Sequence, residues 1–190
     1  MKRLFAAVDV DDSTREAIAR MGTVLRDTIA RGSSRLRVTW VHPDRLHLTL
    51  EFLGDVDQAA EERARLALDE PIPVAPFALR FEGLGFFPDT GSPRVLWLGI
   101  ADGVAGLRQV HAELRRRLGD LARPDEQFNP HLTLARFRDR VPRQRLKEAV
   151  AMRACAGPCA IDRVTLYESR LSPKGPIYTR VADGLLKRCM

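Results

Sequence analysis

The sequence has no long apolar run and only three cysteines. No stretch of the 190 residues approaches the roughly 20 apolar residues that cross a bilayer, and the first residues lack the apolar core and cleavage site of a signal peptide. The three cysteines, Cys155, Cys159 and Cys189, form no even-numbered disulfide framework. We interpret Cys155 and Cys159 as ordinary small residues, since no further ligand pair lies near them. These absences predict a cytoplasmic protein without membrane contact.

The motifs of several cofactor-dependent classes are also missing. The sequence contains no Gly-rich loop ending in Gly-Lys-Ser/Thr, no dinucleotide fingerprint and no Lys-x-Asp-Gly motif of nucleotidyl transfer. We therefore expect no organic cofactor and no metal ion, and ATP-dependent ligation is not indicated. Lysine is scarce, with only four among the 31 basic residues, yet the net charge is +6. A basic surface attracts phosphate-rich partners, although a solvated surface is the simpler explanation of the charge on its own.

The hydrophobic content of 45% and charged content of 29% are those of a soluble globular domain, and the apolar pattern follows one order twice. Each half reads as strand, helix, strand, helix, strand. The first half has expected strands at 4–10, 46–53 and 77–87 with helices at 13–32 and 57–69; the second has strands at 95–100, 131–137 and 161–171 with helices at 104–118 and 142–153, before a last strand at 177–181.

This internal repeat predicts an α+β fold made of two duplicated β-α-β-α-β units. We expect a single two-lobed domain over residues 1–190, with pseudo-repeats at about 1–90 and 91–190. Each lobe must cover one face of its sheet, so the helices should lie outside and the two antiparallel sheets should face a central cleft. A monomer is expected.

The repeat extends to an identical tetrapeptide, because His-Leu-Thr-Leu occurs at 47–50 and again at 131–134. Alternate residues of a strand share a face, so His47 lies beside Thr49 and the leucines point to the other side. His131 and Thr133 repeat this arrangement. An approximate two-fold relation between the lobes would bring both His-Thr pairs to one cleft.

Two imidazoles and two hydroxyls suit phosphodiester chemistry. Hydrolysis needs a base that takes a proton from water and an acid that protonates the leaving oxygen, and histidine can do either near pH 7. Threonine hydroxyls can donate to the non-bridging oxygens. A single His-x-Thr would usually be structural, but two matched copies favour function, since histidine and threonine gain nothing from facing a dry core.

The two motifs and their flanking residues resemble the bacterial and archaeal RNA 2′,3′-cyclic phosphodiesterases, formerly called 2′-5′ RNA ligases, of the 2H phosphoesterase superfamily. The similarity covers essentially the whole chain and is carried by residues 4–9, 46–54, 85–88, 94–99, 129–136 and 166–172. It implies a bilobed fold and metal-independent hydrolysis of a terminal 2′,3′-cyclic phosphate to a 2′-phosphomonoester. It also implies that His47 is the proton donor and His131 the proton acceptor, which near-symmetry alone leaves open.

The resemblance implies a further phosphate ligand, Arg136, alongside Thr49 and Thr133. Strict alternation places Arg136 on the face opposite His131, so it reaches the cleft only if the strand bends or ends there. The first copy has Phe52 at the matching position. A surface arginine is the alternative interpretation.

The expected partners are RNA ends, or small nucleotides, that carry a 2′,3′-cyclic phosphate. Two alternatives stay open. A related enzyme could use the same residues on small cyclic nucleotides or on 2′-5′ linkages, including reverse 2′-5′ ligation. The second alternative is a non-catalytic module that binds RNA ends.

Overall fold

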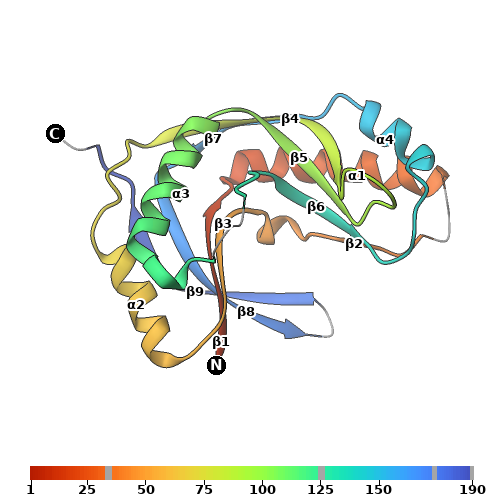
Figure 1. The fold of residues 1–190 in the computed structure, drawn as a ribbon. Helices are drawn as coiled ribbons and strands as arrows, with labels where there is room; N and C mark the ends of the chain where they lie inside the picture. The colour runs from red at the N-terminus through yellow and green to blue at the C-terminus, as the bar shows by residue number, and fades with distance from the viewer. Residues whose placement is uncertain (33–35, 124–126, 173–174, 189–190) are drawn as a thin grey trace.

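The computed structural model describes residues 1–32, 36–123, 127–172 and 175–188. Strands and helices alternate through most of the chain (Figure 1). In chain order the elements are β1 (Lys2–Asp9), α1 (Asp12–Gly32), β2 (Val38–Trp40), the 3-10 turn η1 (Pro43–Arg45), β3 (His47–Val56), α2 (Gln58–Asp69), β4 (Phe77–Phe87), β5 (Val95–Asp102), α3 (Val104–Leu118), η2 (Gly119–Leu121), β6 (Leu132–Phe137), η3 (Arg143–Leu146), α4 (Lys147–Ala151), β7 (Cys155–Ile161), β8 (Arg163–Ser172) and β9 (Gly175–Leu185).

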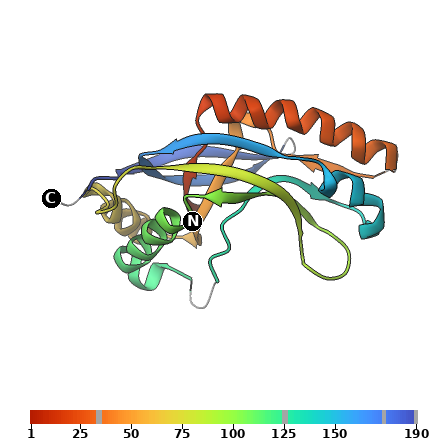
Figure 2. The same cartoon turned by 90° about the horizontal axis from the view of Figure 1, so that it is seen from above.

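The strands form two antiparallel sheets, as the sequence predicts. Sheet A has the order β3-β1-β8-β9 and sheet B the order β2-β6-β5-β4-β7. Helices α2 and α3 pack on sheet A, while α1 and α4 pack on sheet B. Figure 2 shows α1 along one side of the long strands and α2 with α3 on the other side, near the opposite end. The expected α+β class, with two sheets and helices outside, is confirmed.

The sheets do not follow the two halves of the chain. β4 comes from the first half and lies in sheet B, whereas β8 and β9 come from the second half and lie in sheet A. The orders β3-β1-β8-β9 and β6-β5-β4-β7 correspond strand for strand, so each unit gives its third strand to the other sheet. Neither half near the expected boundary at residue 90 therefore forms a lobe by itself.

Most of the helices form where the apolar periodicity of the sequence predicts them. Ile18, Leu25 and Ile29 form the buried stripe of α1, each at most 3% exposed. The helix begins after Asp11, whose side chain accepts a hydrogen bond from the N–H of Thr14 at 2.8 Å. Burying a leucine or isoleucine side chain contributes about 1.5–3 kcal/mol, so this stripe fixes α1 against sheet B.

Three elements depart from the expectation. β2 and β7 are strands that the apolar pattern does not reveal, because β2 has three residues and β7 is rich in small residues. The helix expected at 142–153 is divided into η3 and the five-residue α4. Among the described residues, no helix is long and apolar enough to span a membrane.

Candidate active site

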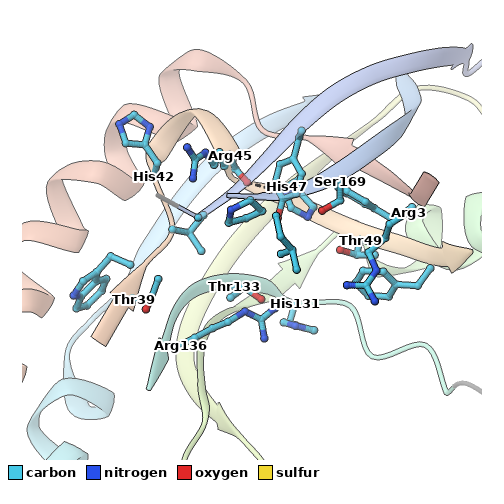
Figure 3. Close-up of a pocket in the computed structure, with 18 of the residues that line it drawn as sticks. Arg3, Thr39, His42, Arg45, His47, Thr49, His131, Thr133, Arg136 and Ser169 are labelled. Atoms are coloured by element: carbon cyan, nitrogen blue, oxygen red, sulfur yellow. Dashed lines mark hydrogen bonds between the residues drawn. The ribbon is translucent and has the colours of Figure 1, made fainter. Parts of the chain in front are cut away.

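A cavity of about 440 Å³ lies between the cleft-facing sides of the two sheets. Figure 3 shows His47 and Thr49 on one side of it and His131, Thr133 and Arg136 on the other. The structure thus brings together all five residues that the sequence singles out. The lining residues are Arg3, Phe5, Thr39, Trp40, Val41, His42, Arg45, His47, Thr49, Phe52, His131, Thr133, Arg136, Arg138, Ser169, Leu171, Gly175, Pro176 and Tyr178.

Alternation along β3 and β6 separates the core from the cavity. Leu48 and Leu50 in β3 are at most 4% exposed, as are Leu132 and Leu134 in β6. His47, which precedes Leu48, and Thr133, which lies between Leu132 and Leu134, are half-buried and line the cavity. The division between packing leucines and cavity-facing polar residues is therefore the one that the period of a strand dictates.

A β-bulge explains how Arg136 reaches the cavity. In β6, Thr133 pairs with Trp97 and Ala135 pairs with Leu96, so one extra residue of β6 interrupts the register. An inserted residue reverses the alternation that follows it, which returns Arg136 to the face of His131. β3 has the same irregularity, because Thr49 pairs with Ala7 and Glu51 with Ala6. Strict alternation was therefore the wrong assumption for the end of both strands.

Both catalytic candidates are oriented in the same way. Nδ1 of His47 lies 2.7 Å from the carbonyl oxygen of Arg45, and Nδ1 of His131 lies 2.8 Å from that of Asn129. A carbonyl oxygen only accepts hydrogen bonds, so each Nδ1 must carry a proton and donate it. The remaining nitrogen, Nε2, is then the atom that can exchange a proton with a substrate.

Electrostatics distinguish the two imidazoles. Burial is the main cause that lowers the pKa of His47 below its ordinary value, while the Arg45 carbonyl and the Asp9 carboxylate oppose this shift. Burial also lowers the pKa of His131, and the Asn129 carbonyl opposes this shift. Among the described residues, no carboxylate adds to the effect of that carbonyl. Asp9 therefore favours the protonated form of His47 alone.

Asp9 is itself held in place by several donors. It lies opposite His47 in the β1–β3 register. Its carboxylate accepts hydrogen bonds from the Tyr167 hydroxyl at 2.7 Å and the Arg180 guanidinium at 3.2 Å, and it lies 3.1 Å from the Thr165 hydroxyl. Gly99 occupies the matching position of β5, so sheet B has no equivalent carboxylate.

Aromatic rings surround His47. Its ring centroid lies 5.0 Å from that of Phe5 and 5.2 Å from that of Tyr178, and Phe5 also packs against Phe52 at 6.0 Å. His131 contacts Phe87 at 4.9 Å. Such rings offer apolar faces on which an unpaired base could stack.

The cavity is positively charged. Arg3, Arg45, Arg136 and Arg138 line it, and none of the described lining residues is acidic. Arg3, Arg45 and Arg138 are not predicted from the sequence motifs, although the position of Arg138 two residues after Arg136 indicates that it could share the same face of the strand. Among the described residues, no group of three or more His, Cys, Asp and Glu side chains is arranged to hold a metal ion.

His111 does not belong to this cavity's lining. Its ring stacks on Phe128 with centroids 4.1 Å apart, and its Nε2 lies 3.4 Å from a carboxylate oxygen of Glu51. His111 therefore packs against Phe128 and Glu51 outside that lining.

Comparison with known proteins identifies relatives over nearly the full length. The family model of the 2′-5′ RNA ligase superfamily matches residues 11–172. An RNA 2′,3′-cyclic phosphodiesterase of Archaeoglobus fulgidus is 36% identical over 178 residues, which cover 93% of this chain and 96% of the relative. Another, of Methanothermobacter thermautotrophicus, is 32% identical and covers 93% of this chain and 95% of the relative.

Solved structures agree with the sequence relatives. The crystal structure of TT0787 of Thermus thermophilus superposes with a TM-score of 0.78 at 31% identity, and 98% of each chain is covered. Escherichia coli LigT complexed with 3′-AMP superposes with a TM-score of 0.75 at 28% identity, over 98% of this chain and 99% of that one.

Proposed function

The chain belongs to the 2′-5′ RNA ligase superfamily, and we propose that it hydrolyses the 2′,3′-cyclic phosphate at RNA ends to a 2′-phosphomonoester. One observation carries this proposal: two identically oriented His-x-Thr pairs and Arg136 surround one arginine-lined cavity. The names of relatives in Archaeoglobus and Methanothermobacter, both RNA 2′,3′-cyclic phosphodiesterases, support the reaction and the substrate.

In the proposed reaction, Nε2 of His131 takes a proton from water, and the water oxygen bonds to phosphorus. The bond between phosphorus and the 3′ oxygen breaks, and Nε2 of His47 donates a proton to that oxygen. The attacking and leaving oxygens lie on opposite sides of phosphorus, which suits two histidines from opposing sheets. No metal ion takes part in this scheme. Each proton transfer contributes about 10²–10⁴-fold to the rate.

Asp9 supports the assignment of His47 as the acid. An acid must hold its proton until the leaving oxygen departs, and the carboxylate of Asp9 raises the pKa of His47 against the effect of burial. Arg136 lowers the pKa of both histidines, and His131 has no described carboxylate that opposes this effect, which leaves His131 as the proposed base.

Thr49, Thr133 and Arg136 are the proposed ligands of the phosphate. The two hydroxyls come from opposite sides of the cavity, where they can donate to the two non-bridging oxygens. Arg136 supplies a positive charge for the negative charge that grows in the transition state.

The decisive experiment maps the product. RNA with a 2′,3′-cyclic end is incubated with the protein in buffer containing EDTA, and the terminal phosphate is located by phosphorus NMR. We expect a 2′-phosphate at an undiminished rate. A 3′-phosphate product would contradict the assignment of the leaving oxygen, and abolition of activity by EDTA would contradict the metal-independent scheme.

Two other functions use the same residues. A preference for small cyclic nucleotides or 2′-5′ linkages, including reverse ligation, would appear when those substrates are assayed beside an oligonucleotide. A non-catalytic module would bind a 2′-phosphate end tightly and leave the cyclic form intact. The donor–acceptor geometry at both imidazoles favours catalysis over binding alone.

We also propose that the protein acts as a monomer in the cytoplasm. All of the proposed catalytic groups belong to one chain. Cys155 and Cys159 are free thiols, which suits a reducing compartment. Sedimentation of the active protein at assay concentration tests the oligomeric state.

A further inference from the structure

Sheet B has a strand for which sheet A has no counterpart. The short β2 pairs with the outer side of β6, whereas β3 forms the edge of sheet A. Through Thr39 and Trp40, β2 lengthens the cavity beyond the two histidines. Figure 3 shows Thr39 at one end of the cavity and Arg3 at the other, with His47 and His131 between them. A substrate longer than one nucleotide would have to continue toward one of these ends.

Arg138 stands at the end that β2 forms. It follows Arg136 by two residues, and both line the cavity. Its Nε donates a hydrogen bond to the Thr39 hydroxyl at 3.2 Å, and its backbone N–H donates to the Arg37 carbonyl oxygen at 2.9 Å. These contacts with Thr39 in β2 and with Arg37 just before it fix the backbone of Arg138 and one edge of its guanidinium.

The neighbouring carboxylate does not neutralise Arg138. Asp139 accepts hydrogen bonds from the backbone N–H of Arg37 at 2.8 Å and from its guanidinium at 2.6 Å. Among the described residues, no carboxylate forms an ion pair with Arg138. At the other end of the cavity, Arg3 lies 3.7 Å from a carboxylate oxygen of Asp55. The end near β2 is therefore the one that offers an uncompensated cation.

Resting on the proposed function, we propose that Arg138 and Thr39 form a second phosphate subsite. It binds the phosphodiester that joins the terminal nucleotide to the nucleotide before it. Two residues along a strand advance by about 6.6 Å, which is close to the spacing of successive phosphates in an RNA strand. With Arg136 on the cyclic phosphate, Arg138 meets the next one, so the enzyme prefers an oligonucleotide end to a free mononucleotide.

The test compares two substrates: adenosine 2′,3′-cyclic phosphate and the dinucleotide ApA that ends in the same cyclic phosphate. The wild-type protein should have the higher kcat/KM on the dinucleotide. Arg138→Gln should lower the ratio of the two kcat/KM values about tenfold, because a charge-assisted hydrogen bond to the phosphate is lost. Thr39→Val, which keeps the shape and removes the hydroxyl, should lower the ratio about threefold.

Two controls make the result specific. Arg140→Gln removes an exposed arginine outside the cavity and should leave the ratio unchanged. An uncharged methylphosphonate in place of the linking phosphate should reduce wild-type activity on the dinucleotide to the level of Arg138→Gln, and should cost that variant little more. The wild-type measurement does not depend on the folding of any variant.

Different outcomes would refute the second phosphate subsite and the proposed function. The protein could hydrolyse both substrates while neither Arg138→Gln nor the methylphosphonate lowers the ratio of the two kcat/KM values. That result would refute the subsite and leave the proposed function intact. A loss of the ratio in Arg3→Gln alone would also refute it, since the RNA would then run to the other end. A wild-type protein that hydrolyses neither substrate would refute the proposed function and the subsite together.

Discussion

Sheet A and sheet B share a backbone plan and differ in the side chains placed on it. Both carry His-Leu-Thr-Leu on matching strands, both bond Nδ1 of the histidine to the carbonyl two residues earlier, and both interrupt the strand with a bulge after the threonine. After the bulge, sheet A presents Phe52 and sheet B presents Arg136. The two His-x-Thr pairs can bind a symmetric phosphate from both sides. Phe52 and Arg136 give the two sides of the cavity different chemistry, so they can distinguish the two sides of the substrate.

The largest effect should come from replacing either histidine of the two His-x-Thr pairs. His47→Ala and His131→Ala should each lower kcat by about 10²–10⁴-fold, since each removes one proton transfer. The double variant should fall little below the worse single one, because the two groups act in one step. Thermal unfolding provides the control for folding. A single variant with near wild-type turnover would refute its assigned role.

The residues after the bulges should respond unequally. Arg136→Gln should lower kcat/KM by about 10²-fold, because it removes the positive charge that we propose binds the reacting phosphate. Phe52→Ala, at the matching position of sheet A, should act mainly on KM and by only a few-fold. Steady-state kinetics on the dinucleotide would measure both. Equal losses in kcat would show that the two sheets are not specialised.

Glu51, at the bulge of β3, should contribute to the stability of the protein in a way that the matching residue of β6 cannot. It is 3% exposed, lies 3.2 Å from the Arg115 guanidinium and accepts a hydrogen bond from the Arg123 backbone at 3.1 Å, whereas Ala135 occupies the matching position. Glu51→Gln should lower the free energy of unfolding by about 2 kcal/mol.

Urea unfolding measures this change, and Glu62→Gln is the matched control. Glu62 is 65% exposed and lies 3.8 Å from Arg65, so its loss should cost no more than about 0.5 kcal/mol. Equal losses in the two variants would show that burial gives the Glu51 ion pair no special weight.

The threonines should respond alike. Thr49→Val and Thr133→Val each remove one of the two hydroxyls that we propose bind the phosphate, so each should lower kcat/KM by roughly tenfold. Matching losses in the same assay would show that the symmetric part of the site binds the phosphate evenly. A loss confined to one variant would assign the non-bridging oxygens to one sheet.

The smallest effect should separate the two histidines. The Asp9 carboxylate opposes the effect of burial on the pKa of His47, so Asp9→Asn should lower that pKa further. An acid loses activity above its pKa, so the basic limb of the rate profile should move to lower pH while the acidic limb stays. Movement of the acidic limb instead would make His47 the base. NMR titration of the His47 ring checks the direction of the shift.

Much of the site could be predicted from local sequence. A period of two places His47 and Thr49 on one face and the leucines on the other, and duplication of the tetrapeptide indicates two such faces. The position of Arg136 could not be predicted, because a bulge depends on how β6 pairs with β5. The short β2 was also missed, because three residues give too little pattern to detect.

The sequence by itself determined the two His-x-Thr faces, the apolar stripes of the helices and the family, since each depends on spacing along the chain. Only the tertiary structure decided which strands pair, because the third strand of each unit crosses into the other sheet. It also decided that Asp9 lies opposite His47 and that Asp139 binds Arg37 and not Arg138. Those are contacts between residues far apart in the chain, and no local pattern encodes which of them meet.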